Sequence, residues 1–228
     1  MKSERDQWIA IKRSLNSYDV DESWEQGFEL FRKRILKKFI EPIDAIIELK
    51  NHHGEGFAIV TIQCALIETF SAFKYGKIYN HRYHEGVDPG YQYNDSREIF
   101  VKFLRNENIF EGHFWIFEAG GKVPDKPFSA NDFYSNVRCA LMHEGKTRKN
   151  WTINVKPRSL PVGVFLSESR GKKKIYRTVL QRSLKKYLND YIDELRIEGN
   201  SELRKYFARE MDHLYQLKKN NLGWWNGD

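Results

Sequence analysis

The chain has 228 residues, of which 40% are hydrophobic and 30% are charged, so it can bury a core without disulfides or structural metals. We find no apolar run near the roughly 20 residues that cross a bilayer and no apolar secretory signal at the N-terminus, so we expect a cytoplasmic protein without membrane contact. The net charge of +7 and the pI of about 9.2 favour a polyanionic partner.

Helical patterns fill the first third of the chain. Residues 1–20 mix charged and aromatic side chains, and they predict either a short helix or a docked N-terminal arm. From about residue 21 to 51, apolar residues recur every three or four positions, as in an amphipathic helix. Pro42 lies inside this pattern and should kink or split the helix.

The next helix, about residues 57–75, is almost entirely apolar. Its only charge before Lys74 is Glu68. A buried carboxylate needs a partner, because an unpaired buried charge is costly. Arg138 is one candidate, and water or a backbone donor is the alternative.

Four further segments lead to the centre of the chain. Residues 76–94 form a polar, aromatic connector, and a helix follows from Asp95. Residues 110–119 predict a short helix or turn that ends at two glycines. Residues 123–129 then form a loop with two prolines.

Residues 129–151 predict one helix, its stop signal and the entry to a strand. Ser129 is an N-cap candidate, Asp132 stands where a capping box places its acid, and Gly145 is a C-terminal stop. At roughly 100° per residue, one arc of the helix should face the core, and it consists of Phe133, Val137, Ala140 and Leu141. The opposite arc carries Asp132, Ser135, Arg138, Cys139, Met142 and His143.

The six residues from Arg138 to His143 resemble the R-x4-6-H motif of HEPN domains, which are helical modules of prokaryotic toxin, antiphage and CRISPR-associated proteins. The resemblance covers about residues 55–155 and includes the helix that carries Glu68. Many HEPN nucleases have Asn, Asp or His directly after the arginine, where this chain has Cys139.

The resemblance implies a metal-independent ribonuclease with a composite site in a dimer cleft. Arg138 would hold the phosphate and His143 would move protons or orient the ribose 2′-hydroxyl. The supporting residues would be Glu68, Cys139, Ser135 and Asp132. The alternative from the residues alone is an arginine that pairs with a neighbouring acid and a histidine that only ends the helix.

In the last third of the chain, the hydrophobic pattern changes from helical spacing to the alternation of strands. Residues 152–156, 162–166 and 174–179 predict short strands of a small antiparallel sheet or hairpin, and two helices follow from about residue 180. If this hairpin lies beside the end of the Arg138–His143 helix, basic residues from both would form one rim that attracts an RNA backbone. These residues are Lys146, Arg148, Lys149, Arg170, Lys172, Lys173 and Lys174. A solvated hairpin turn is the alternative.

We therefore expect a mainly α protein, a HEPN-like helical bundle with a small β element near residues 152–179. Its expected parts are an N-terminal arm or short helix over residues 1–20, a helical core over 21–151, and a hairpin with C-terminal helices over 152–228. The expected function is that of an endoribonuclease, with RNA, a second copy of the chain and an antitoxin or defence-system protein as partners, and with no metal or cofactor. The alternative is a non-catalytic RNA-binding or protein-interaction module.

Overall fold

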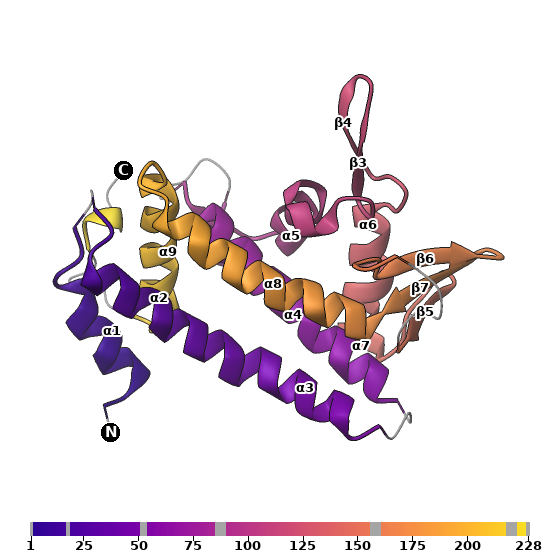
Figure 1. Ribbon diagram of the computed structural model, residues 1–228, viewed down its shortest axis with the longest axis horizontal. Helices are drawn as coiled ribbons and strands as arrows, with labels where there is room; N and C mark the ends of the chain where they lie inside the picture. Colours follow the sequence, from indigo (N-terminus) through magenta and orange to yellow (C-terminus); the bar gives the residue numbers. More distant parts are fainter. Residues whose placement is uncertain are drawn as a thin grey trace. The chain divides into compact units, whose positions relative to one another are not determined.

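The computed structural model of the protein describes residues 2–16, 19–50, 54–84, 90–155, 161–217 and 223–226. This part of the chain is mainly helical with small sheets, as expected (Figure 1). The chain forms two compact units from interleaved segments. Unit 1 contains Met1–Lys38, Thr69–Ser96 and Leu188–Asp228, and unit 2 contains Phe39–Glu68 and Arg97–Tyr187. Neither unit follows the consecutive segments considered from the sequence.

In unit 1 the N-terminal segment is a docked helix, α1 (Glu4–Lys12), which Ser3 caps. The buried carboxylate of Asp212, on α9 (Ser201–Leu214), accepts hydrogen bonds from Trp8 Nε1 at 2.8 Å and from Lys12 Nζ at 2.6 Å. Trp225 Nε1 donates to the same carboxylate at 2.9 Å. A charged acceptor thus ties both ends of the chain to α9, and charge-assisted hydrogen bonds of this kind are strong.

The core of unit 1 is aromatic. From α2 (Glu22–Ile35), Phe28 and Phe31 meet Phe207 of α9 at ring-centroid distances of 5.4 and 5.6 Å. Phe31 also lies 4.5 Å from Phe73. The 76–94 connector adds two-residue strands, β1 (Ile78–Tyr79) and β2 (Gln92–Tyr93), which pair in parallel.

The helix that begins as α2 does not break at Pro42. It continues as a π-helical segment, Leu36–Ile40, and then as α3 (Glu41–Glu48), with Pro42 in the first turn of α3. Proline has no N–H and its ring crowds the carbonyl four residues earlier. A local π turn accommodates that conflict without ending the helix, so the kink or split expected at this proline takes the form of a π segment.

The apolar helix is α4 (Glu55–Tyr75), and it is the one described helix that is long and apolar enough to span a membrane by length and composition. Core helices of soluble proteins also meet that criterion. Ile59, Val60, Leu66 and Ile67 are each 0% exposed. In unit 2, Gln63 Nε2 donates to the Arg177 carbonyl at 2.8 Å, which joins α4 to the start of α8 (Arg177–Arg196).

After α5 (Ser96–Asn106), the prediction of a helix or turn over residues 110–119 is wrong in its second half. Strands β3 (Trp115–Glu118) and β4 (Gly121–Pro124) form an antiparallel hairpin that projects from the helices of unit 2 (Figure 1). The hairpin turn is Ala119-Gly120, and Gly121, the first residue of β4, has a positive φ of 110°. The apolar run therefore belongs to a strand.

The C-terminal sheet is mixed rather than antiparallel. Strands β5 (Trp151–Asn154), β6 (Leu166–Ser169) and β7 (Lys172–Tyr176) lie in the order β5-β7-β6. The β6–β7 hairpin is antiparallel as expected, but β7 lies between β6 and β5 and runs parallel to β5. The third predicted strand also ends early, because Arg177 already starts α8.

Candidate functional site

The helix with the Arg138–His143 motif has three parts in unit 2. These are α6 (Ala130–Phe133), a π-helical segment Tyr134–Cys139, and α7 (Ala140–Glu144). Ser129 accepts a hydrogen bond from the Asp132 N–H at 3.3 Å, and Gly145 ends the helix with a φ of 64°. Phe133, Val137, Ala140 and Leu141 are buried. The predicted helix, cap, stop and core face are therefore confirmed.

The π segment changes the geometry of the motif. The Asn136 carbonyl accepts a hydrogen bond from the Arg148 N–H at 2.9 Å, so it is engaged outside the helix. π turns often occur at functional sites. Because Arg138 lies in this segment, a uniform 100° rotation per residue does not describe its position relative to His143.

Arg138 is held by Glu68 of α4. Arg138 Nη2 donates to both carboxylate oxygens, each at 2.9 Å, and the two side chains are 17% and 22% exposed. The partner that the sequence offered for Glu68 is thus confirmed. Burial lowers the pKa of Arg138, but the hydrogen bond and charge of Glu68 outweigh it and raise that pKa above its usual value. The guanidinium therefore stays charged, with its charge balanced by one carboxylate.

Two cysteines and a tyrosine surround this pair. Tyr134 lies under the Arg138 guanidinium, 5.5 Å from ring centroid to Cζ, and Cys139 directly follows Arg138 at the end of the π segment. Both cysteines are free thiols. Burial raises the pKa of Cys64 to about 12, so this thiol stays protonated and unreactive at neutral pH.

His143 lies in the last turn of α7, five positions after Arg138, and is exposed. Within the described ranges, no hydrogen bond or ion pair joins its side chain to Arg138 or to any other residue. The chain therefore presents a half-buried arginine and an exposed histidine on one helix, and no hydrogen bond or ion pair in the described residues joins them.

The Asp132 carboxylate does not complete the predicted capping box and has a structural role instead. Its carboxylate accepts hydrogen bonds from Asn136 Nδ2 at 2.7 Å, Trp151 Nε1 at 2.9 Å and Lys173 Nζ at 2.7 Å. Burial raises the pKa of Asp132, but these hydrogen bonds outweigh it and hold that pKa below its usual value. Asp132 thus joins the helix to β5 and β7. Ser135 is half-buried on the same helix.

The predicted basic rim forms in part, at one end of the three-stranded sheet. Trp151 pairs with Lys173, and the Lys173 N–H donates to the Asn150 carbonyl at 3.0 Å, so the loop before β5 lies beside the start of β7. Lys149 is therefore close to Lys172, and both are exposed. Arg170 lies in the adjoining β6–β7 turn. We call Lys149, Arg170 and Lys172 the basic rim.

The other predicted RNA-binding residues differ in their surroundings. Lys146 and Arg148 both pair with Glu144, and Lys173 pairs with Asp132 at 2.7 Å. Lys174 is half-buried on β7. Three of the seven predicted cations therefore pair with an acid of the protein, and Lys146 and Arg148 share one carboxylate.

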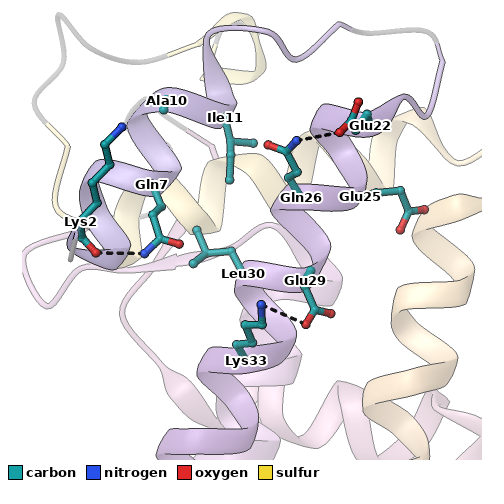
Figure 2. A pocket seen from close by; sticks show the side chains of 10 residues that line it. All are labelled: Lys2, Gln7, Ala10, Ile11, Glu22, Glu25, Gln26, Glu29, Leu30 and Lys33. Carbon is teal, nitrogen blue, oxygen red and sulfur yellow. Dashed lines mark hydrogen bonds and ion pairs between the residues drawn. The ribbon is translucent and has the colours of Figure 1, made fainter.

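Two hollows lie outside this region. One, of about 580 Å³, lies between α1 and α2 of unit 1 (Figure 2). Its charged lining residues are three acids and two lysines, and Glu29 pairs with Lys33 at 3.5 Å. The other, of about 420 Å³, lies in unit 2 at the starts of α4 and α8. Neither contains a residue that the sequence singled out for the site.

Metal-ligating side chains do not gather in the described part of the chain. No group of three or more His, Cys, Asp or Glu residues there is placed to hold a metal ion.

Known proteins offer no closer guide to this site. No family model, no curated protein and no solved structure matches the chain. The resemblance to HEPN domains therefore depends on the residues around Arg138, His143 and Glu68 alone.

Proposed function

We propose that the protein is a metal-independent endoribonuclease of HEPN type. The observation that carries the proposal is the exposed His143 at the end of the helix that contains Arg138, directly before the chain enters the basic rim. An imidazole side chain can transfer protons at neutral pH, and a fixed guanidinium can hold a phosphate. The basic rim would attract the RNA backbone without reading its sequence.

The proposed chemistry is transesterification. The 2′-oxygen of a ribose forms a bond to the adjacent phosphorus while the bond from phosphorus to the 5′-oxygen breaks. His143 takes the proton of the 2′-hydroxyl or delivers one to the leaving 5′-oxygen. In Arg138, Glu68 occupies Nη2, so Nη1 and Nε are the donors that would meet the phosphate.

Within the described residues of one chain, no hydrogen bond or ion pair joins the side chains of Arg138 and His143. This fits a composite site, in which a second copy brings its own pair. We therefore propose a homodimer. A cytoplasmic toxin or antiphage protein, with an antitoxin or defence-system partner, is the role that the family resemblance implies.

A non-catalytic RNA-binding or interaction module is the second candidate. Glu68 already balances the charge of Arg138, and no described residue orients His143 by a hydrogen bond. An arginine bound in this way can be a purely structural link between α4 and the motif helix. The basic rim would then hold RNA without cleaving it.

Cleavage of RNA in EDTA separates the two candidates. Purified protein is incubated with total tRNA and with a mixed single-stranded RNA, beside the His143→Ala and His81→Ala variants. Both histidines are exposed, so neither change should disturb the fold. A nuclease leaves cyclic or 3′-phosphate ends and loses cleavage only in His143→Ala. Binding without cleavage by a folded wild-type dimer would favour the module instead.

A further inference from the structure

The hollow at the starts of α4 and α8 is built from three separate segments of unit 2. The start of α4 and the residue before it contribute Gly54–Phe57. The end of β5 and the residue after it contribute Ile153–Val155, and α8 contributes its first residue, Arg177. A Cβ on Gly56 would lie 3.0 Å from Ile153 Cγ2, so a glycine is what lets α4 and β5 approach here. The volume of about 420 Å³ falls in the range of small-molecule sites.

Arg177 is the feature that points to a ligand. The residue is 4% exposed, and its Nη2 donates to Glu55 Oε1 at 3.1 Å. Its Nη1 is also buried, and it has no hydrogen-bond partner among the residues that the structure describes. Leaving a buried charged donor unsatisfied is costly, so a ligand acceptor that reaches Nη1 from the hollow would complete this side chain.

The charge of the hollow indicates what kind of acceptor fits. The Glu55 carboxylate already balances Arg177, so a phosphate or carboxylate in the hollow would add an excess negative charge. A neutral group with carbonyl or ring-nitrogen acceptors meets Nη1 without that penalty.

The walls favour a flat aromatic ligand. Phe57 lines the hollow and is 40% exposed, so its ring is accessible for stacking. Asn154, which also lines the hollow, has an amide with both donors and acceptors. An aromatic platform, an arginine donor and an amide together are the groups that proteins use to bind an unstacked RNA base.

We propose that this hollow captures one unstacked nucleobase of single-stranded RNA, stacked on Phe57 and hydrogen-bonded to Arg177 Nη1. The inference rests on the proposed RNA-related function, but it does not require cleavage. It makes single-stranded or looped RNA the preferred substrate class, because a base in a duplex cannot reach the hollow.

The test compares two fluorescent eight-nucleotide RNAs that carry the same number of phosphates. One has all its bases and the other is abasic throughout, and 2′-fluoro riboses prevent cleavage in both. Binding to the full-length chain is followed by fluorescence anisotropy. The variants are Phe57→Ala, Phe57→Trp and Arg177→Lys, and Phe117→Ala on the β3–β4 hairpin is the control, since Phe117 is 66% exposed and lies outside the hollow.

Base capture predicts that wild type binds the base-bearing RNA about tenfold more tightly than the abasic RNA, since stacking of one base has this order of effect. Phe57→Ala should remove the difference, whereas Phe57→Trp and Phe117→Ala should keep it. Arg177→Lys, which retains the charge but loses Nη1, should reduce it. Equal affinity for the two RNAs, or equal effects of Phe57→Ala and Phe117→Ala, would overturn the proposal.

Adenosine and guanosine, followed by ligand NMR, separate this proposal from the ribonuclease one. Nucleoside binding that is lost in Phe57→Ala supports the base pocket even if the protein never cleaves RNA. Binding of ribose 5-phosphate but of neither nucleoside would show an anion site and would contradict the proposal, whether or not RNA is cleaved.

Discussion

At the scale of single residues, packing fixes the buried histidine of unit 2. His113 is 5% exposed and stacks on Phe165 at 3.8 Å between ring centroids. Its Nε2 accepts a hydrogen bond from the Phe165 N–H at 3.1 Å, and its Nδ1 lies 3.0 Å from the Glu111 carbonyl. These contacts fit the neutral ring with the proton on Nδ1.

His113 should therefore make the protein sensitive to acid. Burial lowers the pKa of His113 to about 4, from an ordinary value of 6.5. The unfolded chain binds the proton first, so stability falls as the pH drops from about 6.5 toward 4, by on the order of 2 kcal/mol at pH 4.5. His113→Leu should be less stable at pH 7, because the Phe165 N–H loses its acceptor, but its stability should depend less on pH. Urea unfolding at pH 7 and 4.5 measures both effects.

Glu210 in unit 1 changes the stability with pH in the opposite direction. The His113→Leu variant must therefore be compared with wild type at each pH. Burial raises the pKa of Glu210 to about 8, so its contribution to stability falls as the pH rises from about 4.5 to 8. This contribution is common to both proteins and cancels in their difference. If the difference between wild type and His113→Leu did not change with pH, His113 would not be the acid-sensitive group.

At the scale of elements, two helix ends have the same backbone conformation but different surroundings. Gly76 follows α4 with a φ of 58°, and Gly145 follows α7 with a φ of 64°. A Cβ on Gly76 would lie 2.5 Å from Tyr206 Cδ1, whereas a Cβ on Gly145 would meet nothing within 4 Å. The Gly76 carbonyl also accepts a hydrogen bond from Arg209 Nη1 at 3.2 Å.

This contrast predicts unequal effects of the same substitution. Gly145→Ala should cost about 1–2 kcal/mol, because alanine resists a left-handed conformation. Gly76→Ala should cost clearly more, roughly 3 kcal/mol or above, since the Tyr206 ring must also move and strained cores lose about 1–3 kcal/mol. Denaturant unfolding of both variants gives the two free energies. Equal losses would mean that Tyr206 moves aside freely.

At the scale of the whole molecule, the net charge of +7 matters less than where the cations lie. Lys33, Lys37 and Lys38 form an exposed basic run on the helix from α2 to the π segment. The basic rim has the same number of charges on a loop and a strand end beside the motif helix. The two sets therefore allow a test at constant net charge.

Changing the basic rim to glutamine should weaken binding to single-stranded RNA and lower its salt dependence. Each lost phosphate contact reduces the slope of log affinity against log salt by roughly 0.7, so the triple variant should lose about 2. The matched Lys33→Gln, Lys37→Gln, Lys38→Gln variant should leave the slope nearly unchanged. Titrations at several salt concentrations measure both. Similar losses in the two variants would show that only net charge attracts RNA.

The sequence by itself determined what depends on near neighbours along the chain. The mainly helical class, the Ser129 cap, the Gly145 stop and the buried face around Val137 all follow from periodicity and local hydrogen bonding. For Glu68 the sequence left two alternatives open, pairing with Arg138 or with water or a backbone donor, and the structure decided for Arg138.

Only the tertiary structure decided what depends on groups far apart in sequence. Strand β7 lies between β5 and β6 and pairs with β5 in parallel, and no local pattern records this strand order. Asp132 became a structural acceptor because Trp151 and Lys173 reach it from two strands. Arg177 looked like a strand residue, yet it starts α8 and faces a hollow shared with Phe57, about 120 positions earlier in the chain. Long-range packing decides such contacts, and the local sequence does not encode them.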